Sequence, residues 1–261
     1  MSLSKSIEYV KQNSTDPFDI VRLKNILDRK IPDDEELVGL IKSQRQDGSW
    51  SPFWAKDSSS LDATCYRLAM LEQAGIKTHP VIERAIEFIT KQMNEMGYFE
   101  ENNIPIDMCP PWVMPGDIKA RLYLTANCGF WINHYSSNID NRIITYLREH
   151  IDINGNINSY LHTNWLIGGL FYSLGLFKEA EAIFQCLCEQ FPKLSSDNLA
   201  WLINTLIVSG VNNEEEIIKK SITRLIELRN NDGSWSSDDG SLKDIHTTIE
   251  SIRALSCVGI S

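Results

Sequence analysis

The sequence lacks several features that would place it in a large protein class. No apolar run reaches the roughly 18 residues that a membrane-spanning helix needs, so no transmembrane segment is expected. The first five residues (MSLSK) contain no basic stretch followed by an apolar one, which predicts no signal peptide and a cytoplasmic location. Walker loops, dinucleotide fingerprints, Gly-x-Ser-x-Gly elbows and His-Glu-x-x-His motifs are also absent, so these common enzyme classes have no support.

Positive charge is scarce as well. The 261 residues carry a formal net charge of −10, and an acidic surface repels phosphate backbones, so nucleic acid is not an expected partner. The six cysteines form no Cys-x-x-Cys pair and, in a chain expected in the cytoplasm, predict small buried residues rather than a disulfide framework. Hydrophobic residues make up 43% of the chain, which is enough for a core and argues against disorder.

What the sequence does contain is an internal repeat. Residues 44–50 (QRQDGSW) and 229–235 (RNNDGSW) share an Asp-Gly turn, in which glycine accepts a positive φ without strain. A helical pattern precedes each turn, at 35–43 and 214–228, and a second one follows it, at 61–74 and 245–258. The turns at 96–99 and 154–157 are degenerate copies, and a further hairpin is expected within 7–30, broken at 14–17.

The second helix of each hairpin fits one frame, in which a glycine lies thirteen positions after the first residue. Five segments share this spacing: 62–75, 116–129, 162–175, 197–210 and 246–259. A glycine directly after a helix is the usual C′ residue, so the frame predicts five helices that end at these glycines. With the first hairpin the total is about six, which predicts an all-α ring, an α/α toroid, as one domain over residues 1–261. The periodicity alone also permits an open arc.

Helical periodicity separates two faces of each such helix. Positions 0, +4, +7 and +11 of the frame mix polar and aromatic residues, so we expect them to line a solvated or ligand-holding lumen, because unpaired buried polar groups are costly. Positions +3, +6 and +9 are mostly apolar and are expected to pack against the outer helices; Cys65 belongs to this set. The alternative for Asp62, Asp117 and Asp197 is that they are N-caps. Trp112 lies in a proline-rich loop, 109–115, of the kind that can cover a site.

Three kinds of chemistry are open to the lumen residues. Asp62 and His246, with His162, have side chains of the type that binds zinc, and they meet if the ring closes first hairpin to last. Asp62 beside His246 could instead be an acid–base pair in which the environment tunes one pKa. Glu250 shares a face with His246 and Arg253, although a local ion pair between Glu250 and Arg253 is an alternative. The lumen also carries aromatic residues able to stabilise a carbocation by cation–π attraction, or simply to form core: Tyr66, Tyr123 and Trp201.

The Gln-x-x-Asp-Gly-Ser-Trp turn, followed by a Ser-rich link and Asp-Ala-Thr (62–64) or His-Thr-Thr (246–248), resembles a known repeat. Squalene and other terpene cyclases share it with protein prenyltransferase β subunits. The resemblance implies an α/α toroid whose inner helices line a cavity for an isoprenoid chain. It has two departures: the Asp-x-Asp-Asp acid motif of the cyclases is absent, with 236–239 (SSDD) the nearest string, and the zinc-binding Asp-x-Cys is one residue longer here, at 62–65. The cyclases are also usually much larger, with a second helical domain.

The sequence therefore predicts a small enzyme, resembling a terpene cyclase or prenyltransferase, that acts on an isoprenoid or similar hydrophobic molecule in a central cavity. The residues expected to act in catalysis are Asp62, His246 and Glu250. Those expected to contact substrate are Tyr66, Tyr123, His162, Trp201, Asn204 and Arg253. Zinc or magnesium is the cofactor to test, with Asp62 and His246 as the ligands. Two other functions stay open: a non-catalytic toroid that binds a lipid or peptide, and a subunit that requires a partner chain.

Overall fold

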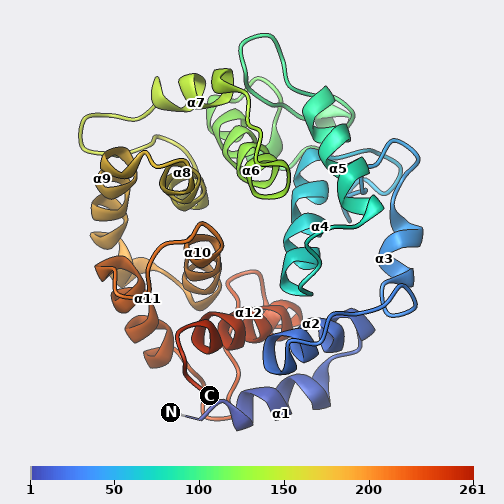
Figure 1. Cartoon of the computed structure of the whole chain (residues 1–261), viewed down its shortest axis with the longest axis vertical. Helices are drawn as coiled ribbons and strands as arrows, with labels where there is room; N and C mark the ends of the chain where they lie inside the picture. The colour runs from blue at the N-terminus through green and yellow to red at the C-terminus, as the bar shows by residue number, and fades with distance from the viewer. Residues whose placement is uncertain (1) are drawn as a thin grey trace.

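The computed structural model describes residues 2–261, in which twelve α-helices form a ring of two layers (Figure 1). The outer helices are α1 (Ser4–Asn13), α3 (Val38–Ser43), α5 (Pro80–Lys91), α7 (Asn141–Arg148), α9 (Phe177–Cys188) and α11 (Glu216–Glu227). The inner helices are α2 (Pro17–Asp28), α4 (Leu61–Gln73), α6 (Ile118–Ser136), α8 (Leu161–Ser173), α10 (Ser196–Val208) and α12 (Asp244–Cys257). Each outer helix precedes an inner one along the chain, so the predicted all-α toroid of six hairpins is confirmed.

The ring is closed by its first and last hairpins. Helix α12 packs against both α1 and α2, and the two termini lie side by side in Figure 1. An open arc is therefore excluded. In the part of the chain that the structure describes, no helix is both long enough and apolar enough to cross a membrane.

Each Asp-Gly-Ser-Trp turn joins the two helices of its own hairpin. The backbone N–H of Trp50 donates to Thr64 Oγ1 of α4 (3.1 Å), and its indole N–H donates to the Leu40 carbonyl of α3 (3.2 Å). In the last hairpin, Trp235 donates in the same way to Thr248 of α12 (3.0 Å) and Leu225 of α11 (2.7 Å). Both tryptophans are buried, so the conserved geometry of the turn fixes the register between outer and inner helix.

The turn glycines also join four of the six hairpins to the next one. Gly48 has a φ of 93°, and a Cβ there would collide with the Arg84 carbonyl of α5. Gly233, with a φ of 95°, lies so close to α1 that a Cβ would come within 2.7 Å of the Lys5 carbonyl carbon. The degenerate turns 96–99 and 154–157 contact α7 and α9 likewise. The last turn thus closes the ring by the same contact that links the earlier hairpins.

The glycine frame is confirmed for four inner helices and wrong for one. The residues with positive φ directly after their helices are Gly75, Gly175, Gly210 and Gly259. Gly129 instead lies inside α6, where it faces Ile143 of α7, and the helix continues to Ser136. The backbone N–H of Phe99 donates to Thr125 Oγ1 (3.1 Å), the contact that Trp50 makes with Thr64. The true frame of α6 therefore starts at Tyr123, seven residues later than predicted.

The predicted apolar face agrees with the structure, whereas two of the three predicted N-caps do not. The apolar positions of α4, α8, α10 and α12 are buried, as predicted, and Cys65 is among them. Asp117 caps α6 by accepting from the backbone N–H of residues 119 and 120, which confirms that N-cap. For Asp62 and Asp197 the N-cap interpretation is wrong, because Ser60 caps α4 and Ser195 precedes α10.

Candidate active site

The starts of the inner helices meet at one end of the ring. Tyr123 of α6 contacts Asp62 of α4 and lies 4.6 Å, between ring centroids, from His162 of α8. His162 stacks on Trp201 of α10 at 5.0 Å. These contacts bring Asp62, Tyr123, His162 and Trp201 together at this end of the ring.

This end of the lumen is open to solvent. Tyr66 is 44% exposed although it lies on an inner helix, and its ring is 5.7 Å from that of His246 on α12, which is partly exposed as well. Asp62, His162 and Trp201 are partly exposed as well, so these side chains of inner helices border a space that solvent reaches. We call the space bordered by Asp62, Tyr66, His162, Trp201 and His246 the recess.

Asp62 is held in the recess by two neutral donors. Tyr123 Oη donates to Asp62 Oδ1 (2.6 Å), and Trp112 Nε1 donates to Asp62 Oδ2 (3.3 Å). No basic side chain pairs with Asp62 within residues 2–261. Burial raises the pKa of Asp62, and the two hydrogen bonds oppose that rise only in part. The Asp62 carboxyl group therefore holds its proton more firmly than usual. After the proton is lost, Tyr123 and Trp112 stabilise the carboxylate by donating hydrogen bonds to it.

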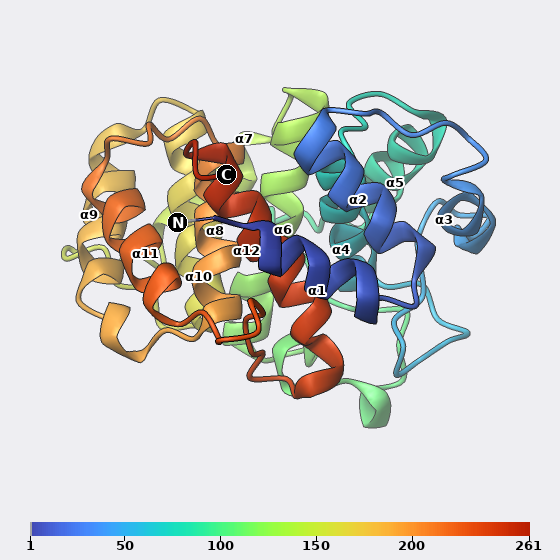
Figure 2. The same ribbon diagram turned by 90° about the horizontal axis from the view of Figure 1, so that it is seen from below.

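The loop around Trp112 reaches Asp62 from outside the helical frame. Residues Pro111–Val113 form a 3₁₀ turn, and the Trp112 indole packs edge-to-face on that of Trp54, with 5.6 Å between centroids. Phe53, next to Trp54, lies 5.9 Å from the Lys243 ammonium of the loop before α12. These loops gather at the lower side of Figure 2. The prediction that loop 109–115 contributes to a site is supported by its contact with Asp62; its opening and closing stay a prediction.

A second buried acid, which the sequence reasoning missed, lies behind Asp62. Glu101 Oε1 accepts from Ser60 Oγ (2.6 Å) and from the backbone N–H of Asp62 (3.1 Å) at the start of α4. Its other oxygen, Oε2, is buried and has no hydrogen-bond partner. Burial is the main cause that raises the pKa of Glu101 to about 7. Glu101 follows α5 in a loop, outside the repeat frame, so no periodicity marked it.

Glu250 is surrounded by partners. Its Oε1 accepts from Arg22 of α2 (3.1 Å) and Gln73 of α4 (2.5 Å), and its Oε2 accepts from Asn204 of α10 (2.7 Å). Burial would raise the pKa of Glu250, but its interactions with His246 and with the guanidinium groups of Arg22 and Arg253 outweigh it, and the pKa is lowered. Glu250 is therefore an ionised group that ties together four inner helices. The sequence reasoning also missed Arg22, which is fully buried within the apolar stretch of α2.

His246 takes part in that cluster and does not pair with Asp62. Its Nδ1 accepts from Arg22 Nη1 (3.2 Å), and its Nε2 lies 3.6 Å from Glu250 Oε1. Burial, followed by the charge of Arg22, lowers the pKa of His246 to about 4, and burial lowers that of His162 to about 4. The predicted Asp62–His246 acid–base pair is wrong, because each residue holds other partners. Both imidazoles are neutral near pH 7.

The residues present do not fit a zinc or magnesium ion. Residues 2–261 contain no group of three or more His, Cys, Asp or Glu side chains arranged to hold a metal. Both oxygens of Asp62 accept hydrogen bonds, and the Nδ1 of His246 faces a guanidinium group, which repels a cation. Cys65 lies against Cys128 (Sγ–Sγ 3.9 Å), and burial raises its thiol pKa well above the usual value. The metal site predicted at Asp62 and His246 is therefore wrong.

Two other predicted contacts have structural partners. Arg253 pairs with Glu72 of α4 (2.6 Å) rather than with Glu250, so the local ion-pair alternative on α12 is wrong. Asn204 donates to both the side chain and the backbone carbonyl of Glu250. The predicted substrate contacts of Tyr66, His162 and Trp201 stay predictions, and these are the side chains that border the recess.

No family model matches the sequence, and a comparison with curated proteins finds no relative. Among solved structures, the chain resembles a protein from Actinoplanes (TM-score 0.64, 12% identity, 98% of each chain covered). It also resembles the type II terpene cyclase MstE from Scytonema (TM-score 0.60, 15% identity, 97% of each chain covered). MstE has also been solved with its substrate, geranylgeranyl dihydroxybenzoate, and in that form 98% of this chain matches 97% of MstE.

These likenesses show a terpene cyclase-like fold. The likeness to MstE covers 97% of each chain, so it extends over the whole toroid. At 15% identity the likeness assigns no residue a role, so the function must be argued from the recess itself.

Proposed function

We propose that this protein is a terpene cyclase that starts its reaction by protonating an isoprenoid double bond in the recess, with Asp62 as the acid. The observation that carries the proposal is the setting of Asp62: partly buried, without a cation, and hydrogen-bonded to the neutral donors Tyr123 and Trp112. The fold shared with a type II terpene cyclase supports it, as does the substrate named for that cyclase, which carries a prenyl chain.

In this reaction the Asp62 O–H bond breaks and a C–H bond forms at the less substituted carbon of the terminal double bond, which leaves a tertiary carbocation on its dimethyl carbon. The Asp62 carboxylate is then stabilised by the Tyr123 hydroxyl and the Trp112 N–H. Tyr66 and Trp201 present aromatic faces to the recess, where cation–π attraction contributes about 2 kcal/mol or more to a desolvated cation. The next double bond closes the ring, and loss of a proton ends the sequence.

The neutral imidazole of His162 is the group that we expect to accept this last proton. It lies between Tyr123 and Trp201, on the side of the recess away from the Arg22–Glu250 cluster. His246 has Arg22 on its Nδ1 and Glu250 near its Nε2, so it is better placed to anchor the cluster than to receive a proton.

Incubation in D₂O tests the proposal. The purified chain is given geranylgeranyl dihydroxybenzoate, geranylgeranyl diphosphate and squalene, and products are analysed by mass spectrometry. We expect a cyclic product that carries one deuterium at the protonated terminus and, from the diphosphate, a product that keeps its diphosphate. Products lacking deuterium, or released diphosphate, would overturn protonation by Asp62. A ring that only binds lipid would return every substrate unchanged, and a subunit would gain turnover only with a partner chain.

A further inference from the structure

A second cavity, of about 560 Å³, opens at the opposite end of the ring, where α2, α4, α6 and α12 end. The buried Arg22–Glu250 cluster lies between it and the recess. Along α12, His246 faces the recess, Glu250 follows one turn later, and Arg253 and Cys257 line the cavity. Arg22 and Glu250 do not line it. The two ends of the lumen are therefore separate spaces, and no role in the proposed reaction accounts for the second one.

The charge of this cavity is opposite to that of the chain. Arg29, Lys77 and Arg253 line it, against a single carboxylate, Glu72, which is held by Arg253 at 2.6 Å. Within residues 2–261 neither Arg29 nor Lys77 forms an ion pair. Burial and the charges of Arg253 and Lys77 lower the pKa of His134, so both cations act on the same part of the cavity. A protein of net charge −10 thus gathers unpaired positive charge at one opening.

The helix ends do not cancel this charge. Four helices, α2, α4, α6 and α12, end at the cavity, and each C-terminus carries up to about −0.5 of a charge on its free carbonyls. Several of these carbonyls are already satisfied, as when Gly75 and Ile76 donate to the last turn of α4 and Arg29 donates to Asn25 of α2. Partial charges that are bonded in this way fall off within one turn, whereas the ammonium of Lys77 carries its full charge into the opening.

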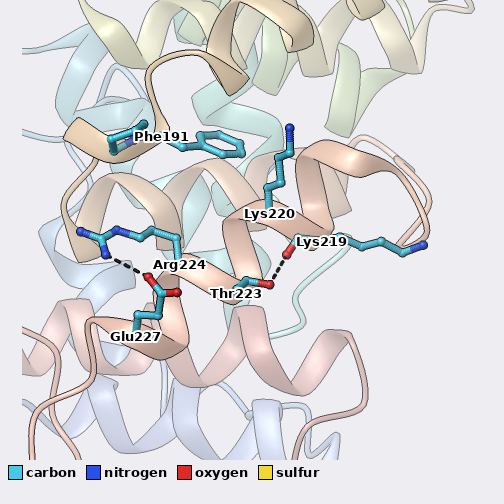
Figure 3. A pocket seen from close by; sticks show the side chains of 7 residues that line it. Phe191, Lys219, Lys220, Thr223, Arg224 and Glu227 are labelled. Atoms are coloured by element: carbon cyan, nitrogen blue, oxygen red, sulfur yellow. Dashed lines mark hydrogen bonds and ion pairs between the residues drawn. The ribbon is translucent and has the colours of Figure 1, made fainter.

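A hollow on the outer surface shows what an ordinary basic surface looks like in this protein. Phe191 and α11 border it, and three cations line it (Figure 3). Each has a carboxylate partner: Lys219 with Glu214 (2.7 Å), Lys220 with Glu216 (2.6 Å) and Arg224 with Glu227 (2.9 Å). In the cavity at the end of the lumen, by contrast, Arg29 and Lys77 have no carboxylate partner among the described residues.

The cavity also has apolar walls. Ile26, Ile31, Ile76 and the ring of Tyr135 line it, and its volume lies within the range of small-molecule sites, about 300–1,000 Å³. We propose that this cavity binds an anionic amphiphile, with an acyl or prenyl chain against the isoleucines and a carboxylate or phosphate between Arg29 and Lys77. Such a site lies outside the proposed cyclisation and would exist whether or not the recess is catalytic.

Calorimetry with three twelve-carbon probes tests this site: dodecanoate, dodecyl phosphate and dodecanol. We expect at least one anion to bind ten times more tightly than the alcohol, and the better of the two anions identifies the head group. The double variant Arg29→Asn, Lys77→Gln removes both charges, and asparagine tolerates the positive φ of 55° at position 29. It should bind the anions no better than the alcohol, while Lys219→Gln in the outer hollow changes nothing.

Cys257 supplies a second readout, because it lines the cavity and is partly exposed. A bound anion should slow its alkylation by iodoacetamide at least fivefold and leave Cys186, on α9, unaffected. Equal binding of alcohol and anions, unchanged binding by the double variant, or no protection of Cys257 would each overturn the proposal. Repeating the titration with Asp62→Asn separates this result from the fate of the proposed cyclase activity, since binding should persist there.

Discussion

Asp62 and Glu250, two carboxylates at neighbouring levels of one lumen, have opposite surroundings. Asp62 has only the hydroxyl of Tyr123 and the indole of Trp112, and its pKa is raised. Glu250 has the guanidinium of Arg22 and two amides, and its pKa is lowered. The difference shows that burial alone does not decide whether a carboxyl group keeps its proton. Without a cation, burial favours the protonated form; with one, the same depth gives a stable ion.

The largest test of this contrast is Asp62→Asn, which keeps the shape of the side chain and removes its acidic proton. Loss of a general acid should lower turnover on the order of 10³-fold, with little change in melting temperature. Turnover by mass spectrometry and thermal unfolding measure the two effects. Asp117→Asn is the matched control, because asparagine also caps a helix and residue 117 only caps α6. Full turnover by the Asp62→Asn variant would show that Asp62 is not the general acid.

Glu250→Gln should act on stability first. It leaves the fully buried guanidinium of Arg22 with only the partly exposed carboxylate of Asp19 (3.2 Å), and the loss of its buried partner costs about 3–5 kcal/mol. In a chain of this size that lowers the melting temperature by about 10 °C or more. Adding Arg22→Met to a Glu250→Met variant should restore much of the loss, since the buried cation is then gone and Asp19, its other partner, is partly exposed. A Glu250→Gln chain as stable as the parent would contradict the ionised cluster.

Glu101 resembles Asp62 in lacking a cation, so it should follow the same rule. Its folded pKa of about 7 lies above its ordinary value of 4.5. The folded chain therefore binds the extra proton between these values, and stability falls as pH rises from 4.5 through 7, by up to about 3 kcal/mol. Glu101→Gln should flatten this slope in urea unfolding at pH 5 and pH 8. An unchanged slope would show that Glu101 is ionised throughout.

The smallest expected effect belongs to Tyr123→Phe. Without one donor the Asp62 anion is less stable, so the pKa of Asp62 rises and turnover falls about tenfold. Because activity requires the protonated acid, the loss of activity at high pH should move to still higher pH. The pH–rate profile measures both changes. Tyr160→Phe is the control, since Tyr160 packs near Tyr123 and makes no bond to Asp62. A profile that moves to lower pH would contradict this role.

Much of the fold followed from the sequence because the repeat is set by local chemistry. Glycines with positive φ end four inner helices at the predicted positions, and the two Asp-Gly-Ser-Trp turns have matching contacts. The predicted frame is wrong at Gly129, where a small residue allows close packing on Ile143 and the φ is not positive. The error of seven residues is close to two helical turns, so Tyr123 was still assigned to the correct face.

The site was harder to predict, because its partners come from outside the frame. Trp112 and Glu101 lie in loops, and no periodicity relates them to Asp62. Arg22 could have been found from the sequence. It is a charged residue between Val21 and Leu23 in an apolar stretch of helix, and a buried arginine needs a buried anion. Its partner, Glu250, is 228 positions away, and only closure of the ring brings the two together.

Because Gly233 contacts α1, the last hairpin is followed by the first, and the hairpins form a closed cycle that could begin at any of them. Every hairpin, the last included, packs against the next one around the ring, and the two ends of the polypeptide lie side by side (Figure 1). A short peptide joining those ends, with new ends opened at the turn Phe191–Lys193, would yield a circular permutant with the same neighbours throughout. In such a protein Arg22 and Glu250 would belong to adjacent hairpins in sequence as they already do in space.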